Sequence, residues 1–455
     1  MFSRRGFLKS LASASLVVAT ACEGDEDGLT RLDNVPPFTS DETRRTARFP
    51  LGVQAGGMEQ TTAVVWSYAP LDASVRLLVW RKGDGPRESI IDTVVDVEDG
   101  YLKVLLTALN PETRYRYGWV SGDLTWSDVG EFQTAFEADT LKPLLVGATA
   151  CTSIGRAPFP SIAWLSKASL DVFCHLGDMS YNDGSSTQAD FREAWARTLA
   201  NREYRQLLSS VGTYQTWDDH EVANDDELSS LPPEAIAAGI DAFFESTPSR
   251  RGDNGELWRS FKWGKSVEFF ILDCRFEREP DRQRYISEAQ LSWLKDSLAA
   301  SPCHFKVLLN SVPIAQLPPI WLLETDRWQG YPDQRDELLD WITEQSIRNV
   351  WFLSGDFHLG AVWRIETMGA RRQIWEIVCG PGGSAPSRRF EIASANESAF
   401  ESFFEPEQTI YASGDWAATT LYFDPITDGV TIRFIDSSSE EVAFEKTLSW
   451  LDVDD

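Results

Sequence analysis

Residues 174–183 read CHLGDMSYND and directly follow an apolar run. A buried strand is expected to end here, because glycine, aspartate and asparagine replace the apolar residues and favour a turn. His175, Asp178 and Tyr181 fall within this short stretch, and imidazole, carboxylate and phenolate groups all bind metal ions once deprotonated. The stretch therefore predicts a strand followed by a turn, and that turn either simply closes the strand or holds a metal.

Residues 139–455 repeat this pattern of a short apolar run followed by polar residues. Helical patterns lie between several of the runs, and one of them, residues 287–301, begins with the capping-box pair Ser287 and Gln290. Strands that alternate with helices predict an α/β or α+β fold. A hairpin with a TDG turn is expected over residues 419–436. The expected strands are residues 144–150, 171–177, 213–217, 267–273, 305–310, 349–355 and 374–380.

Residues 49–138 have a different pattern and predict a separate all-β domain. Short runs rich in valine, leucine and aromatic residues are separated by turn signals such as DGP, EDG and SGD. The stretch ALNPETRYRYGWV (108–120) resembles the L-x-P-x-T-x-Y end of a fibronectin-III-like sandwich. The region holds no histidine. We therefore expect the chemistry to lie in residues 139–455.

The first 21 residues predict an export signal that lies outside the fold. SRRGFLK (3–9) matches a twin-arginine (Tat) signal, and the apolar run that follows is shorter than the roughly 20 residues needed to span a bilayer. Ala19 and Ala21 fit an A-x-A cleavage site, whereas Cys22 resembles the lipidated cysteine of a lipobox. A lipid anchor at Cys22 and soluble export both remain open, and either places the protein in the periplasm or cell envelope. Residues 22–48 are expected to be a linker.

The charge balance limits the partners of the chain. Its 70 acidic and 42 basic residues give a formal net charge of −28. Nucleic acid is an unfavourable partner, because its phosphates are neutralised by lysine and arginine. An acidic protein that handles an anionic substrate needs local positive charge, and a metal ion supplies it. The five cysteines after Cys22 are widely spaced, which favours buried free thiols over a disulfide framework.

Polar side chains recur at the C-terminal ends of the predicted strands. Because the loops at that end of an α/β sheet converge on one crevice, we expect these side chains to meet. One carboxylate can bridge two cations, and metal pairs about 3.5–4 Å apart are typical of phosphoryl transfer. The candidate residues, in chain order, are Cys151, His175, Asp178, Tyr181, Asp218, Asp219, His220, Glu221, Asn224, Asp273, Arg275, Arg278, Asn310, Asp356 and His358.

Five motifs among these residues occur in one order: G-D-x-x-Y (177–181), WDDHE (217–221), D-x-R-x-x-R (273–278), KVLLN (306–310) and SGDFH (354–358). Together they resemble the alkaline phosphatase D, or PhoD-like, family of metallophosphoesterases, which is related to purple acid phosphatases. FPLGVQAGG (49–57) resembles the opening of that family's N-terminal β domain. The resemblance implies a metallophosphatase fold, a layered β-sandwich flanked by helices, preceded by a fibronectin-III-like domain.

The resemblance also implies a metal centre of iron (Fe3+) and calcium. Asp178 would bridge two ions, while Tyr181 and Cys151 would bind iron as phenolate and thiolate. Asp219 is preferred to Asp218, and Asn310 is either a calcium ligand or a phosphate contact. The metal ligands expected are Cys151, Asp178, Tyr181, Asp219, Asn224, Asp356 and His358.

The function expected from this resemblance is exported phosphoester hydrolysis by a metal-bound hydroxide. His220 would protonate the leaving oxygen, and Arg275 and Arg278 would bind the substrate phosphate through forked hydrogen bonds. Phosphate monoesters and diesters remain open as substrates, and a monomer is expected. Two other classes are weighed against this function: a surface-anchored binding lipoprotein with a degenerate phosphatase domain, and a glycoside hydrolase with paired carboxylates. A glycoside hydrolase would leave Tyr181 and Cys151 without a role.

Overall fold

The computed structural model describes residues 16–21, 35–38, 41–224, 231–316 and 324–450. The predicted lipidation site at Cys22 and residues 23–34 of the predicted linker lie outside the described residues. Across the described ranges, no helix combines the length and the apolar character that crossing a membrane requires.

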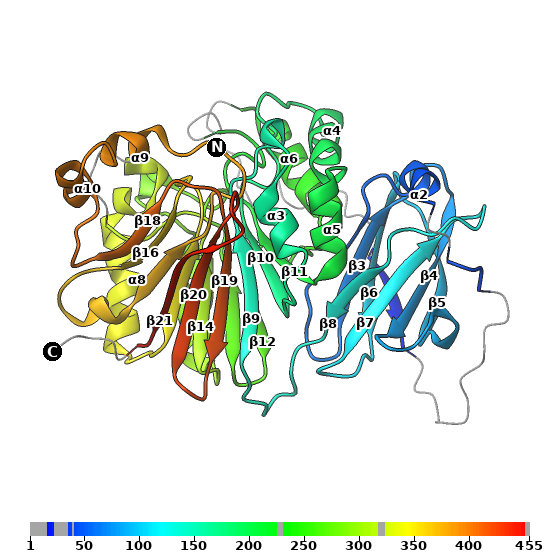
Figure 1. Cartoon of the computed structure of the whole chain (residues 1–455), viewed down its shortest axis with the longest axis horizontal. Helices are drawn as coiled ribbons and strands as arrows, with labels where there is room; N and C mark the ends of the chain where they lie inside the picture. The colour runs from blue at the N-terminus through cyan, green and yellow to red at the C-terminus, as the bar shows by residue number, and fades with distance from the viewer. Residues whose placement is uncertain (1–15, 22–34, 39–40, 225–230, 317–323, 451–455) are drawn as a thin grey trace.

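Two large sheets form the centre of the protein (Figure 1). In order across the first sheet, the strands are β1 (Val17–Thr20), β6 (Tyr101–Thr107), β3 (Ala63–Tyr68), β2 (Val53–Gly56), β11 (Thr213–Thr216), β10 (Val172–Leu176), β9 (Leu144–Thr149), β19 (Ala417–Asp424), β20 (Gly429–Asp436) and β21 (Val442–Leu448). In the second sheet they are β12 (Arg259–Trp263), β13 (Val267–Ile271), β14 (Phe305–Leu309), β15 (Val350–Ser354), β17 (Trp375–Val378), β16 (Gly360–Arg364) and β18 (Thr409–Ser413). Strands β9, β10 and β11 are parallel, as are β13, β14, β15 and β17, so their C-terminal ends lie at common edges.

The two sheets pack on each other because alternate side chains of a strand point to opposite faces. Ile271 of β13 shares one apolar cluster with Leu176 of β10. Its neighbour Phe270 belongs to a second cluster, with Leu294 of α7 (Glu288–Ala300) and Leu338 of α8 (Pro332–Glu344). The second sheet is therefore covered by the first sheet on one face and by helices on the other, which is the layered sandwich that the sequence predicts.

The remaining helices cover the outside of this sandwich. α3 (Pro160–Leu165) packs on β19 and on α5 (Arg202–Ser210), and α4 (Gln188–Leu199) packs on α6 (Pro233–Ser246). α9 (Arg388–Ala393) and α10 (Glu397–Phe403) lie together at the opposite end of the long axis from the N-terminal strands (Figure 1). The expected cap of α7 is present, since the Ser287 hydroxyl accepts the backbone N–H of Gln290 at 3.1 Å. The C-terminal hairpin is also confirmed, as β19 pairs antiparallel with β20.

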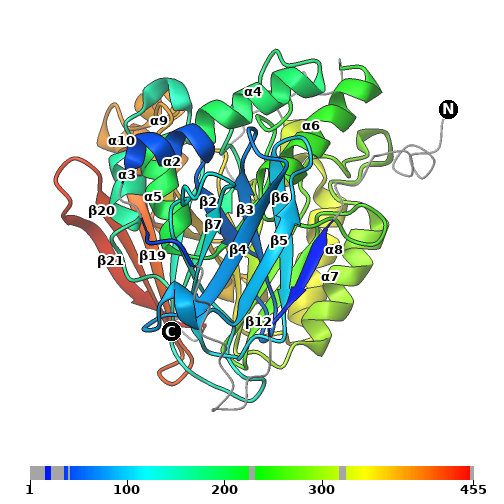
Figure 2. The ribbon, with the colours of Figure 1, turned by 90° about the vertical axis from the view of Figure 1, so that its right-hand side faces the viewer.

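The N-terminal strands form one small sheet of their own and also extend the first sheet. After α2 (Glu42–Arg48), a four-stranded sheet of β5 (Ile91–Asp96), β4 (Ser74–Arg81), β7 (Arg114–Val120) and β8 (Gly130–Gln133) shares an apolar cluster with β2, β3 and β6. Figure 2 shows these strands facing the viewer. However, β2 also pairs in parallel with β11 through Gly56 and Thr213. The separate fibronectin-III-like domain is therefore not confirmed, because a strand pattern does not reveal which distant strand will be its neighbour.

One short strand comes from the predicted export signal. Val17–Thr20 (β1) pairs in parallel with residues 104–107 of β6, and the Ala21 N–H donates to the Thr107 carbonyl oxygen at 2.9 Å. The Ala19 side chain is buried against this sheet. The structure thus differs from the expectation that residues 1–21 lie outside the fold. The physical reason is that an apolar extended segment satisfies the free backbone groups of an edge strand.

Candidate metal centre

The predicted residues follow the C-terminal ends of strands that meet at one end of the sandwich. Cys151, Asp178, Asp356 and His358 adopt φ angles of 56°, 56°, 63° and 52°. This left-handed region is uncommon for residues other than glycine and costs roughly 1–3 kcal/mol at each position. Such angles cluster at functional sites, where the surrounding structure holds them. The loops follow β9 (Cys151), β10 (Asp178 and Tyr181), β11 (Asp218, Asp219, His220 and Glu221), β13 (Asp273 and Arg275), β14 (Asn310) and β15 (Asp356 and His358).

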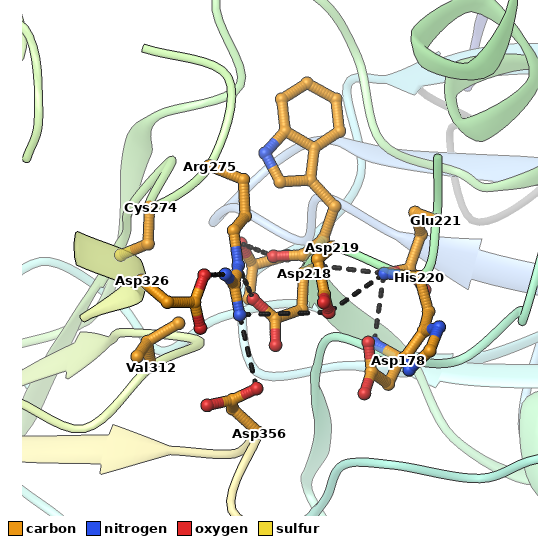
Figure 3. Close-up of polar contacts among 12 residues, drawn as sticks. Asp178, Asp218, Asp219, His220, Glu221, Cys274, Arg275, Val312, Asp326 and Asp356 are labelled. Atoms are coloured by element: carbon orange, nitrogen blue, oxygen red, sulfur yellow. Dashed lines mark hydrogen bonds and ion pairs between the residues drawn. The ribbon is translucent and has the colours of Figure 1, made fainter. Parts of the chain in front are cut away.

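Three groups of side chains have their potential ligand atoms within 4.8 Å of one another. Asp178 belongs to two of the groups, and Asp219 also belongs to two, so both carboxylates stand between neighbouring positions for a cation. Figure 3 shows Asp178, Asp219 and Asp356 directed toward the same region. The groups are Cys151, Asp178 and His358; Asp178, Asp219 and His220; and Asp218, Asp219 and Asp356.

The donor atoms fit bound cations. One oxygen of each of Asp178, Asp218 and Asp356 is buried and has no hydrogen-bond partner among the described residues. Burial, and then repulsion by neighbouring carboxylates, raises the pKa of Asp178 well above its ordinary value, and burial followed by Asp178 does the same for the Cys151 thiol. Removing this many acids from water is unfavourable unless positive charge compensates. A multivalent cation would provide that charge and hold the ligands deprotonated.

Tyr181 and His358 complete the surroundings of the first group. The Tyr181 hydroxyl donates to Asp178 Oδ2 at 3.3 Å, lies 3.4 Å from His358 Nε2 and shares a 2.6 Å hydrogen bond with the Ser384 hydroxyl. His358 Nδ1 lies 2.8 Å from the Ala385 carbonyl oxygen, which can only accept. The proton therefore resides on Nδ1, and Nε2 keeps its lone pair for a metal.

His220 lies against the metal groups and is oriented by a residue that the sequence did not single out. Its Nδ1 is 2.7 Å from Asp183 Oδ2, and its ring packs against that of Tyr181 with centroids 4.0 Å apart and planes tilted by 33°. Burial alone would lower the pKa of His220, but Asp178, Asp183 and Asp219 together raise it to about 11. The direct contact with Asp183 favours the protonated imidazole. Asp183 is within the stretch CHLGDMSYND, but as an exposed residue in an Asn-Asp turn it resembles an ordinary solvent-facing residue.

Arg275 lies among carboxylates. Its Nε donates to Asp218 and its Nη1 to Asp326, while Nη2 is 3.2 Å from Asp356 and 3.8 Å from Asp219 (Figure 3). The guanidinium is only 2% exposed. Asp218, Asp219 and Asp356, the third metal group, thus all contact Arg275. The guanidinium already supplies positive charge to these three carboxylates. Asp326 comes from a 3-10 turn rather than from a strand end, and for that reason the sequence pattern gave no sign of it.

Arg278, Asn310 and Asn224 lie beside the centre and contact other parts of the chain. Arg278 donates to Asp326 Oδ1 at 3.0 Å and lies over the ring of Tyr285, so its guanidinium is already engaged by these two residues. The Asn310 oxygen accepts the Trp328 indole N–H at 2.9 Å. The backbone N–H of Asn224 donates to Asp183 at 3.0 Å.

Other buried polar groups support the loops. His175 is fully buried on β10, where Nε2 is 2.9 Å from the Tyr204 hydroxyl, and burial lowers its pKa to about 3. It is a neutral core residue in this structure. Glu376 of β17 accepts the backbone N–H groups of Ile314 and Ala315, at 2.9 and 3.0 Å, and so fixes the loop after β14.

This geometry agrees with the comparison to known proteins. The sequence profile of the PhoD-like phosphatase family matches residues 144–412, which is more than half of the chain. The chain belongs to the PhoD-like phosphatase family. It is 26% identical to alkaline phosphatase D of Bacillus subtilis (strain 168) over an alignment of 379 positions that covers 71% of this chain and 63% of that relative. The chain thus spans less than two thirds of the curated relative it matches.

Solved structures support the PhoD-like fold. A structure of PhoD superimposes with a TM-score of 0.73 at 20% identity and covers 91% of this chain and 90% of its own. A purple acid phosphatase from yellow lupin (Lupinus luteus) superimposes with a TM-score of 0.63 at 14% identity, over 87% of this chain and 74% of its own. These similarities establish the mixed arrangement of sheets and helices.

Proposed function

We propose that this PhoD-like chain is a metal-dependent phosphoesterase. The observation that carries the proposal is the position of Asp178, whose buried carboxylate lies with Cys151 and His358 in one group and beside the Asp219 carboxylate in another. A carboxylate shared by two cation positions is the arrangement expected of a two-metal phosphoryl-transfer site.

Iron and calcium are the cations we propose, and the donor chemistry supports this division. Cys151, Tyr181 and His358 offer sulfur, phenolate oxygen and imidazole nitrogen, which suit a transition metal. The third group, with Asp219 and Asp356, offers carboxylate oxygen only, which suits calcium. Bound cations would supply positive charge to phosphate oxygens and lower the pKa of a coordinated water.

The chain's own residues supply proton transfer and charge balance. Hydrolysis forms a new P–O bond from water and breaks the ester P–O bond, so the leaving oxygen must gain a proton. His220 is suited to donate that proton, because its direct contact with Asp183 favours the protonated imidazole. Arg275 is suited to hold Asp218 and Asp356 in place, since its guanidinium contacts both. A phosphate-binding role for Arg278 is less favoured, because Asp326 and Tyr285 already engage it.

We further propose that the protein is exported through the Tat route and acts as a monomer in the periplasm or cell envelope, with a lipid on Cys22 as one possible form. The signal-like residues 3–9 and the Ala19-Xaa-Ala21-Cys22 sequence support this location. Phosphate esters are the proposed partners, and both monoesters and diesters are tested below.

The experiment is a metal and activity analysis of the purified protein. Metal content is measured by elemental analysis, and hydrolysis of p-nitrophenyl phosphate and bis-p-nitrophenyl phosphate is followed before and after chelation. We expect bound metal, chelator-sensitive turnover of at least one ester, and loss of both in Asp178→Asn. A metal-free protein without chelator-sensitive turnover would instead favour a binding protein, and full activity in Asp178→Asn would place the chemistry elsewhere.

A further inference from the structure

A second site of concentrated charge lies at the junction of the N-terminal strands with the first sheet. A small cavity there has a volume of about 10 Å³, close to the least that holds one water-sized particle. None of the predicted metal ligands lines it. The lining residues include Gly57, Thr213 and Gln215 on one side and Ser249, Arg250 and Arg259 on the other.

The basic side chains at this cavity contact neutral oxygens only. Arg259 donates from Nε to the Leu257 carbonyl oxygen at 3.1 Å, and from Nη2 to the Arg250 and Glu256 carbonyl oxygens. Lys103, which reaches in from β6, donates to the carbonyl oxygens of Phe244, at 2.7 Å, and Ser249.

Carboxylates act on this charge only without direct pairing: Glu245 attracts Lys103, and Glu256 and Glu59 attract Arg259. In the described part of the chain, no carboxylate lies within ion-pair distance of Lys103, Arg250 or Arg259, and the Arg250 guanidinium has no hydrogen bond. Neighbouring Arg251 differs, since it pairs with Asp241. Three unpaired cations at one place are unexpected in a chain with 70 acidic residues.

The cations also act on one another. Burial, and then Arg259, Arg251 and Arg250, lower the pKa of Lys103 well below its ordinary value. Burial, and then Arg250, likewise lower the pKa of Arg259. Like charges that are partly removed from water repel strongly, and a bound counter-ion relieves that repulsion.

We propose that this cavity binds one small inorganic anion of about the size of a halide, held by the guanidinium groups of Arg250 and Arg259. The Ser249 hydroxyl, which also lines the cavity, adds a neutral donor. A space of this size holds no more than one small particle. Because Gly57 follows β2 and Thr213 begins β11 in the first sheet, while Arg259 begins β12 in the second, the bound anion would stabilise the contact between the two sheets.

The test is thermal unfolding of the full chain in sodium chloride, sodium bromide or sodium gluconate at equal ionic strength. Equal ionic strength keeps general screening the same in each salt. Gluconate is too large for the cavity, so only the halides are expected to occupy it. We expect Tm to be higher by on the order of 2 °C in either halide at saturation. Arg250→Gln should remove this difference, since the Arg250 side chain has no ion pair or hydrogen bond among the described residues whose loss would disturb the fold. Arg81→Gln, at an exposed position on β4, should retain it.

Bromide also gives a direct readout. In crystals grown in sodium bromide, we expect an anomalous scattering peak beside Arg250 and Arg259, and no such peak in Arg250→Gln. Equal Tm values in chloride and gluconate, together with no bromide peak, would overturn the proposal. A stabilisation by inorganic phosphate alone that Arg250→Gln removes would also contradict it, because the site would then take a larger oxyanion. Neither result bears on the metal-dependent activity.

Discussion

The carboxylate of Glu221 accepts the backbone N–H of Asp178 at 3.0 Å and thereby joins the turn after β10 to the turn after β11. The same carboxylate accepts the N–H groups of Met179 at 2.7 Å, Ser180 at 3.2 Å and Asp218 at 2.8 Å. Four backbone donors converge on one buried side chain. Glu221 therefore sets the relative position of two turns that carry metal ligands, although its own atoms belong to none of the metal groups.

Glu221→Gln should lower the stability and the metal affinity of the protein together. The substitution replaces one carboxylate oxygen with an amide NH2 group, which cannot accept hydrogen bonds from the backbone N–H groups that face it. Each unsatisfied buried donor costs about 1–3 kcal/mol. Urea unfolding and elemental analysis measure the two effects. Glu193→Gln, at an exposed position, is the control and should leave both unchanged. Normal stability in Glu221→Gln would show that the two turns are held by other contacts.

Asp183→Asn should shift the alkaline limit of activity to lower pH. A general acid must be protonated to work, and the pKa of His220 is raised to about 11 by Asp178, Asp183 and Asp219 against the effect of burial. Removal of the Asp183 charge lowers that pKa, so the acid is lost at a lower pH. The pH profile of kcat/KM for a phosphate ester with an alkyl leaving group measures this limit.

His220→Gln provides the matched comparison. This variant should lose about 10²–10⁴-fold in the rate of hydrolysis of an alkyl phosphate. The loss should be much smaller for p-nitrophenyl phosphate, whose leaving group needs little protonation. An equal loss on both esters would indicate that His220 positions the substrate rather than donating a proton.

Cys151→Ser should reduce metal content, whereas Cys174→Ser should not. Both thiols are buried and both have a pKa raised mainly by burial, but only Cys151 lies within 4.8 Å of Asp178 and His358 ligand atoms. Cys174 on β10 therefore controls for the general effect of a buried thiol-to-hydroxyl change. Elemental analysis of both purified variants is the measurement. Equal metal content in the two variants would remove Cys151 from the ligand set.

Arg275→Met should make folding depend on divalent cations. The variant leaves Asp218 and Asp326 without their shared cation, and breaking a buried ion pair costs about 3–5 kcal/mol. Thermal unfolding in chelator should show a large decrease in Tm, and added calcium should restore part of it, since a ligand that binds only the folded state stabilises it. Arg284→Met, whose partner is the exposed Glu288, should behave like the wild type. A decrease that calcium leaves unchanged would argue against cation binding at these carboxylates.

The local features of this protein could be predicted from the sequence because they depend on neighbouring residues. The apolar run before Gly177 predicts β10, and the following turn residues place Asp178 and Tyr181 at the C-terminal end of that strand. The same reasoning places Cys151 and Asp356 at strand ends. Five such motifs in one order also identify the family, which the match over residues 144–412 confirms.

The pairings between distant segments could not be predicted in this way. Asp326 reaches Arg275 from a turn 51 residues away, and Gly56 of β2 pairs with Thr213 of β11. Neither contact leaves a pattern in the residues next to it.

The sequence by itself determined the strands, the turns that end them and the residue types available to a metal, since apolar periodicity and turn chemistry act over a few residues. Only the tertiary structure decided which carboxylates share Arg275, that Asp183 orients His220, and that the N-terminal strands continue the first sheet. The physical reason is that burial and long-range packing set the partner of each charged group and each strand edge. Those partners are chosen by proximity in space rather than along the chain.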